Sequence, residues 1–231
     1  MSKIIQRFAG FWVKERSFTF LLIVLMVYIF IVIPLLGVGV PSKIAFIILY
    51  YLLLSSSIPF LRQNNLGSIA LVLILGPFVF FMLEIIYDAS WLPLLNNTFI
   101  ILYCLLLGFI ILWRTFQPGR ITGKRVQGAI IVYLLCGLIF GLLYHSIHLV
   151  NTSKSFNGLT SDHRKEFLYY SFCTLTTDGY GDITPASSLA RAISNLEALV
   201  GQLYPAVLIA RLISMEFYYK SSLSKSTKQT D

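Results

Sequence analysis

The chain has 231 residues, of which 57% are hydrophobic and 12% are charged, and its mean hydropathy is +0.78. A soluble globular domain is about half apolar and about a quarter charged, so this composition excludes an ordinary cytosolic enzyme and indicates an integral membrane protein. The net charge of +8 does not indicate nucleic-acid binding, because the Lys and Arg residues form short clusters between apolar runs, where they report membrane topology. We expect membrane lipid around the chain, no nucleic-acid partner and no organic cofactor.

Six apolar runs are each long enough to cross a bilayer, which takes about 20 residues. They cover residues 18–36, 44–60, 68–87, 91–113, 127–150 and 188–215. If these spans alternate in direction, the basic clusters before, between and after them fall on one side of the membrane. The positive-inside rule therefore predicts a multi-pass protein of the cell membrane with both termini in the cytoplasm.

The region between the last two spans breaks this pattern. Phe167–Leu175 is apolar but too short to cross, which is typical of a re-entrant helix, and it is followed by a stretch rich in glycine and hydroxyl groups, Thr176–Asp182. A cation that leaves water needs replacement oxygens, and a strand that alternates between left- and right-handed backbone conformations can align its carbonyls to supply them. Gly179 and Gly181 permit that alternation without steric cost.

The motif Thr176-Thr-Asp-Gly-Tyr-Gly-Asp182 strongly resembles the carbonyl filter of the potassium channels, whose loops read T-V-G-Y-G. The resemblance implies that K⁺ binds to the backbone carbonyls of Thr177, Asp178, Gly179 and Tyr180, with Gly181 completing the filter. It also implies filter-supporting roles for Tyr169, Tyr170, Thr174, Thr176 and Asp182. An enzymatic activity is not expected.

The last span carries two further features of this resemblance. Gly201 follows Asp182 at the spacing of the family's inner-helix hinge, and Pro205 lies one turn later, where the loss of a backbone donor should kink the helix and form a gate. Because one chain supplies a quarter of the oxygens that a dehydrated ion needs, the resemblance implies a homotetramer. The expected fold is an all-α membrane protein with six transmembrane helices, a re-entrant pore helix and a filter loop.

Five segments follow from these expectations. They are an amphipathic N-terminal segment at 1–17, a four-helix peripheral domain at 18–113, a cytoplasmic linker at 114–126, a pore domain at 127–215 and a short cytoplasmic tail at 216–231. The span 91–113 contains no Lys or Arg, whereas a voltage sensor needs several basic residues within one span. We therefore predict a channel that does not sense voltage.

Asp178 departs from the family pattern, which has Val or Ile at this position. Its side chain should lie behind the filter strand, and we expect it to hydrogen-bond to water or to the hydroxyl of Tyr169, Tyr170 or Thr174. Four ionised copies would draw water and cations behind the filter and weaken the discrimination of K⁺ from Na⁺. The sequence therefore predicts a selectivity that varies with external pH.

Three alternatives stay open. Asp178 is compatible with a weakly selective cation channel or with a non-conducting scaffold. The third is an intramembrane aspartyl protease, because Tyr87-Asp88, Gly179-Tyr-Gly-Asp182 and Pro205-Ala206 resemble motifs of that family. Two aspartates that share a proton could activate water there, provided that both lie in spanning helices. Glu197, which lies within the last span, is expected to bond to the back of the pore helix.

Overall fold

The computed structural model describes residues 17–32, 75–80, 82–83, 86–87, 91–117, 122–151, 155–160 and 163–227. Over these residues it is mostly helical. Its elements in chain order are α2 (Ser17–Val27), η1 (Tyr28–Val32), α6 (Leu92–Thr115), α7 (Gly123–Val150), β1 (Phe156–Asn157), α8 (His163–Leu175), β2 (Thr184–Pro185) and α9 (Ser188–Thr227). The predicted span 44–60, nearly all of the predicted N-terminal segment 1–17, and Asp88 lie outside the described residues.

Three of the described helices are long and apolar enough to cross a membrane: α6, α7 and the Ser188–Phe217 part of α9. They correspond to the predicted spans 91–113, 127–150 and 188–215, while the total of six spans stays a prediction. Helix α9 continues to Thr227, beyond the boundary that we expected at residue 215. The reason is local, because the sequence has neither Gly nor Pro between Ala206 and Thr227 to end the helix.

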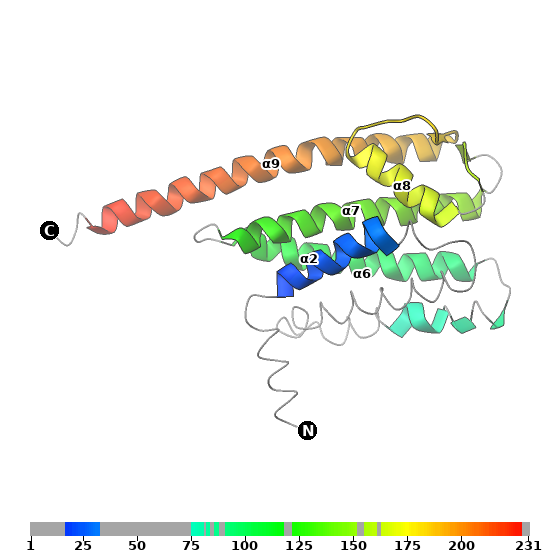
Figure 1. Ribbon diagram of the computed structural model, residues 1–231, viewed down its shortest axis with the longest axis horizontal. Coiled ribbons are helices and arrows are strands. Elements are labelled where there is room, and N and C mark those ends of the chain that lie inside the picture. Colours follow the sequence, from blue (N-terminus) through cyan, green and yellow to red (C-terminus); the bar gives the residue numbers. More distant parts are fainter. Residues whose placement is uncertain are drawn as a thin grey trace, which may run out of the picture.

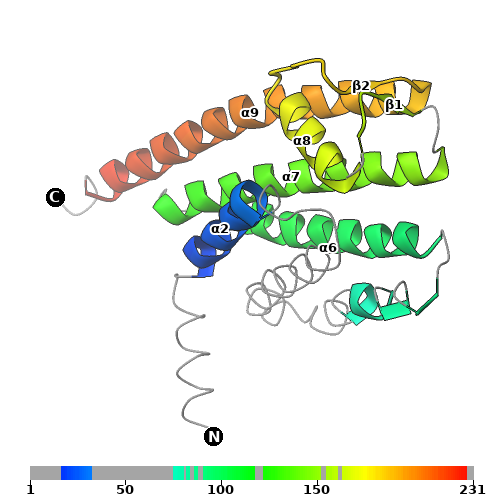
Figure 2. The same cartoon turned by 45° about the vertical axis from the view of Figure 1, so that its right-hand side comes forward.

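Helix α7 is central, since it packs against α2, α6, α8 and α9 (Figures 1 and 2). Residues 131–142 of α7 contribute to an apolar core with α2 and α6. The C-terminal end of α7 joins a second, aromatic core around Tyr144, Phe156 and Phe167. About half of the apolar windows of α6 and α7 is buried, at 50% and 56%, whereas only 11% of that of α9 is buried. Helix α9 therefore leaves most of its apolar surface uncovered.

The fold also contains a small two-stranded sheet, which corrects the expected all-α class. Strands β1 and β2 pair antiparallel, with Phe156 opposite Pro185 and Asn157 opposite Thr184. The Ser155 carbonyl extends this ribbon by accepting the backbone N–H groups of Ala186 and Ser187. The pairing arises because the segments before α8 and after the glycine-rich loop run side by side and satisfy each other's backbone groups.

Candidate functional site

Helix α8 occupies the place of the predicted re-entrant helix, and it begins at His163, earlier than the expected residue 167. Its first turn is held by Glu166, whose carboxylate oxygens accept the Thr160 backbone N–H at 2.9 and 3.0 Å and also bond the Thr160 hydroxyl. An acid in the first turn of the helix thus satisfies a backbone donor of the segment that precedes it. The polar residues that precede the apolar run therefore become part of the helix.

A tight turn ends α8 and leads into the glycine-rich strand. The N–H groups of Thr176, Thr177 and Asp178 donate to carbonyls of α8 at 2.9, 3.1 and 2.9 Å, to Phe172, Thr174 and Cys173 respectively. After this turn, residues 178–183 have neither helical nor strand hydrogen bonding. The chain thus leaves the helix as an extended segment that is attached firmly at its inner end.

This segment has the alternating backbone that the sequence predicts. Thr177, Gly179 and Gly181 have φ angles of +62°, +60° and +80°, and no other residue between 176 and 182 has a positive φ. A Cβ atom at Gly179 would meet nothing within 4 Å, so glycine is needed there for its conformation and not for lack of space. Such alternation turns successive carbonyls toward one side of the strand, which is the geometry of a cation filter.

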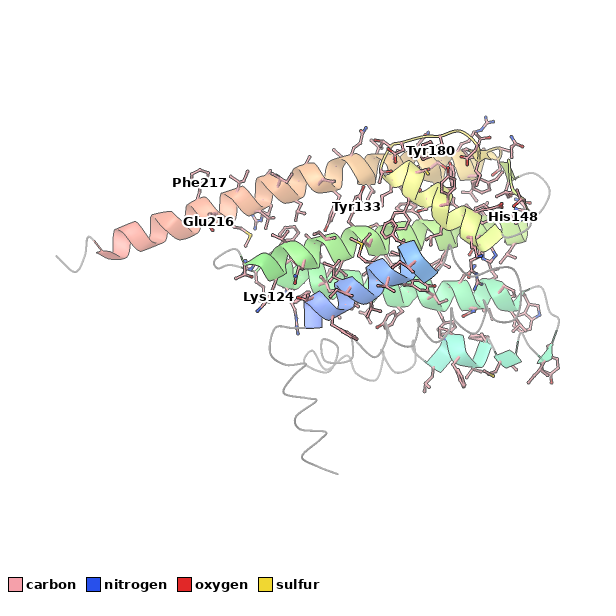
Figure 3. All side chains as sticks on the ribbon, viewed as in Figure 1. Lys124, Tyr133, His148, Tyr180, Glu216 and Phe217 are labelled. Carbon is pink, nitrogen blue, oxygen red and sulfur yellow. The ribbon has the colours of Figure 1, made fainter. Side chains whose placement is uncertain are left out.

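The strand is uncovered on one side. Residues 176–182 are all exposed, and 71% of Tyr180 is accessible. Figure 3 shows Tyr180 beside α8 and α9, on the side of the molecule away from α6. One chain therefore presents the strand without enclosing it.

Of the two predicted bracing tyrosines, only Tyr169 reaches Tyr180 in the described chain. The two rings stack with their centroids 6.3 Å apart and an interplanar angle of 7°. Tyr170 instead lies in the aromatic core, with ring contacts to Tyr144 and Phe156. Neighbouring residues on a helix point in different directions, so one tyrosine faces the strand and the next faces α7.

Asp178 has a different partner from those we expected. Its Oδ2 lies 3.0 Å from the Thr176 hydroxyl oxygen, and its side chain is exposed. The Thr174 hydroxyl donates to the Tyr170 carbonyl at 2.9 Å, and the Thr176 hydroxyl also donates to the Phe172 carbonyl at 2.7 Å. The tight turn after α8 brings residues 176 and 178 together, a local effect that spacing along the pore helix did not indicate.

Gly201 and Pro205, the predicted hinge residues, lie within one uninterrupted helix (Figures 1 and 2). A Cβ atom at Gly201 would lie 1.9 Å from the Leu175 carbonyl oxygen, so this glycine lets the end of α8 touch α9. Because Pro205 has no N–H, the Gly201 carbonyl lacks its helical donor. The expected kink is not a break in the helix, but both features weaken the same turn.

Two tyrosine hydroxyls link α7 to the end of α8 and to α9 near Gly201. The Tyr133 hydroxyl donates to the Leu175 carbonyl at 3.1 Å, and the Tyr204 hydroxyl donates to the Ala129 carbonyl at 2.8 Å. The two rings lie against each other, with centroids 5.8 Å apart. Helix α7 therefore holds both the end of α8 and the turn of α9 that contains Gly201 and Pro205.

A buried polar network lies behind the strand, and only its Glu197 was expected from the sequence. Glu197 bonds to Ser171 of α8, as expected, and also to Tyr144 of α7. Next to it, the Tyr170 hydroxyl lies 2.7 Å from that of Ser194. The hydroxyl groups within the apolar runs could have indicated a buried polar network, but their partners depend on which helix faces meet.

The structure gives no support to the protease hypothesis. Asp182 lies in a loop after the strand and not in a spanning helix, so the protease arrangement lacks one of its two aspartates there. His145 bonds through Nδ1 to the Asn97 amide at 2.9 Å, between α7 and α6. The described residues contain no group of three side chains that could hold a metal ion.

Comparison with known proteins shows what the segment around this site resembles. Residues 129–217 match the family model described as "Ion channel". The chain is also similar to Protein LctB of Bacillus caldotenax, with 36% identity over 91 residues, which is 38% of this chain and 66% of that protein, slightly less than two thirds of its length. No solved structure matches the chain. The matched segment begins in α7 and ends in α9, so it includes the alternating strand and the helices that hold it.

Proposed function

We propose that this chain forms a pore for passive K⁺ permeation across the cell membrane, because residues 129–217 match a family model of ion channels. The observation that carries the proposal is the backbone alternation at Thr177, Gly179 and Gly181 in an exposed strand. It supplies the row of carbonyl oxygens that a dehydrated cation requires. In this proposal both termini lie in the cytoplasm, as the positive-inside rule predicts.

In this pore the carbonyls of Thr177, Asp178, Gly179 and Tyr180 bind K⁺, with Gly181 completing the filter. Tyr169 supports the strand from behind by stacking on Tyr180. Three more chains must supply the remaining oxygens, because one strand reaches an ion from one side only.

We propose a homotetramer, and the exposed surface of α9 supports it. Leu196, Leu199, Leu203 and Val207 recur at helical spacing and are each more than half exposed, at 55%, 54%, 58% and 61%. The opposite face of α9 holds the buried Glu197 and the contacts to α7 and α8. An apolar stripe next to an uncovered filter strand suits packing against copies of the same chain around an axis.

The peripheral helices are proposed not to sense voltage. In α6 the only basic residue is Arg114, in the last turn. Moving one charge through the membrane field contributes about 2.3 kcal/mol per 100 mV, so a span without internal basic residues gives little voltage dependence. A steep conductance–voltage relation in the absence of blocking ions would contradict this part of the proposal.

The second candidate is a cation channel of weak selectivity, and Asp178 favours it. The side chain is exposed in the single chain and stands beside the proposed inner ion sites. A ring of four carboxylates attracts cations regardless of their size, whereas selectivity depends on the carbonyl geometry.

The test is ion flux through the purified full-length protein in liposomes. We expect K⁺ to pass down its gradient much faster than Na⁺, and a Gly179→Val variant to pass neither, because valine does not tolerate the positive φ. Gly123→Val, at an exposed helix start with open space around it, is the matched control. Equal K⁺ and Na⁺ rates would favour the weakly selective pore, and a wild-type rate equal to that of empty liposomes would overturn both.

A further inference from the structure

Glu197 is the only fully buried acid among the residues that the structure describes, with 0% of its surface accessible. Its carboxyl group touches hydroxyls alone. The Tyr144 hydroxyl lies 2.5 Å from Oε2, and the Ser171 hydroxyl lies 2.5 Å from Oε1. These two partners come from α7 and α8, so the carboxyl group joins three helices at one point.

The hydroxyl protons around Glu197 can be counted. Ser171 has a single hydroxyl proton, yet its oxygen lies 2.7 Å from the Gly137 carbonyl as well as 2.5 Å from Glu197. A carbonyl can only accept, so when Ser171 donates to Gly137, the contact with Glu197 needs a proton from the acid. With a protonated Glu197, each short contact has one donor and one acceptor: Tyr144 to Oε2, Oε1 to Ser171, and Ser171 to Gly137.

The titratable groups around Glu197 also favour the protonated acid. The titratable groups near Glu197 are Tyr133, Cys136 and Tyr144 on α7 and, next to Ser194, Tyr170 on α8. None of them is a cation. A buried carboxylate without a cationic partner is strongly disfavoured, whereas a neutral acid with satisfied hydrogen bonds is tolerated.

The position of this contact connects it to the filter. Gly201, which admits the Leu175 carbonyl, lies one helical turn after Glu197 on the same face of α9. Ser171 lies one turn before Leu175 on α8. The pore helix is therefore held to α9 at two successive turns, once by a polar contact and once by close packing, directly before the turn that starts the strand.

We infer that Glu197 is a neutral carboxylic acid that joins the outer, pore and inner helices, and that this joint is a positioning element for the filter strand. The inference deepens the proposed function, and its consequence for selectivity rests on that function. It distinguishes two substitutions, because a glutamine amide can donate to Ser171 and accept from Tyr144 as the neutral acid does, while alanine can do neither.

The experiment compares Glu197→Gln and Glu197→Ala with the wild-type protein in the same liposomes. We expect Glu197→Gln to keep the K⁺/Na⁺ permeability ratio within about twofold, and Glu197→Ala to lower it about tenfold, because losing a buried hydrogen-bond partner corresponds to such a factor. Glu216→Gln, on the same helix near its cytoplasmic end, is the control for removing a carboxylate and should change nothing.

Infrared spectroscopy gives a readout that does not depend on conduction. The wild type should show the C=O stretching band of a protonated carboxylic acid at neutral pH, and Glu197→Gln should lack it. A missing band in the wild type, or a Glu197→Gln variant as damaged as Glu197→Ala, would overturn the inference. If the wild-type protein carries no ions, the proposed function fails, but the band and the thermal stabilities of the two variants still decide this inference.

Discussion

The two sides of the glycine-rich strand differ in how far one chain alone satisfies their polar and apolar groups. Behind the strand, Glu197, Ser171 and Tyr144 form a buried network whose polar groups find partners within the chain. In front, residues 176–182 and the apolar stripe of α9 are exposed. Contacts within one chain therefore determine the position of α8, whereas the proposed ion pathway requires several chains to assemble.

Substitutions on the two sides of the strand should therefore have different effects. Changes behind the strand should unfold or misplace the pore helix in every subunit, and they should appear as lost stability. Changes in front should leave each subunit folded and alter selectivity or assembly. The following predictions test that division, from the largest expected effect to the smallest.

Gly201→Ala should be the most damaging single substitution. The added Cβ atom would meet the Leu175 carbonyl oxygen at 1.9 Å, and backbone on both sides leaves little room to adjust. We expect a loss of about 3 kcal/mol in stability, as for overpacking of a tight interface. The thermal unfolding midpoint in detergent measures this, with Gly123→Ala as the control. Unchanged stability with altered gating would show that Gly201 acts only as a hinge.

Gly158→Ala should disturb the outer end of the strand. Gly158 has a φ of +84°, and an added Cβ atom would meet the Asp182 carbonyl oxygen at 1.9 Å. We expect a cost of about 2 kcal/mol, because both the conformation and the contact require glycine. Unfolding in detergent and the K⁺/Na⁺ permeability ratio should both change. An effect on neither would mean that the β1–β2 ribbon does not hold the outer mouth.

Asp178→Val changes the exposed side of the strand, and it should alter selectivity without lowering stability. A ring of four Asp178 side chains attracts cations regardless of their size, so its removal should leave selectivity to the carbonyl geometry. We expect Asp178→Val to raise the K⁺/Na⁺ ratio about tenfold, or about 1.4 kcal/mol. Reversal potentials under bi-ionic conditions measure this ratio, and Asp178→Asn should match Asp178→Val. Identical values for wild type and Asp178→Val would make Asp178 a silent replacement.

Tyr204→Phe should have the smallest effect. It removes a hydroxyl that donates to the Ala129 carbonyl at 2.8 Å but keeps the ring contact with Tyr133. The expected loss is about 1 kcal/mol, the net value of an ordinary hydrogen bond. Unfolding in detergent measures it, and a loss as large as that of Gly201→Ala would show that this bond carries much more of the contact between α7 and α9.

The sequence was most informative where local chemistry decides the structure. Gly179 and Gly181 predict the alternating backbone because few other residues adopt positive φ, and the long apolar runs predict α6, α7 and α9. The inward turn of Tyr170, the bond of Glu197 to Tyr144, and the contact of Gly158 with Asp182 could not be predicted. Each depends on which helix faces or loops meet, and periodicity along one chain does not determine that.

The length of α9 has a mechanical consequence. Its 40 residues extend about 60 Å at 1.5 Å per residue, about twice the thickness of the hydrocarbon layer. The weakened turn at Pro205 divides the helix into a part fixed to the pore helix and an arm of about 33 Å that ends at Thr227. By simple trigonometry on that arm, a rotation of about 10° at Pro205 would move the arm's end by roughly 6 Å. A force applied near Thr227 would therefore have its greatest leverage at this turn.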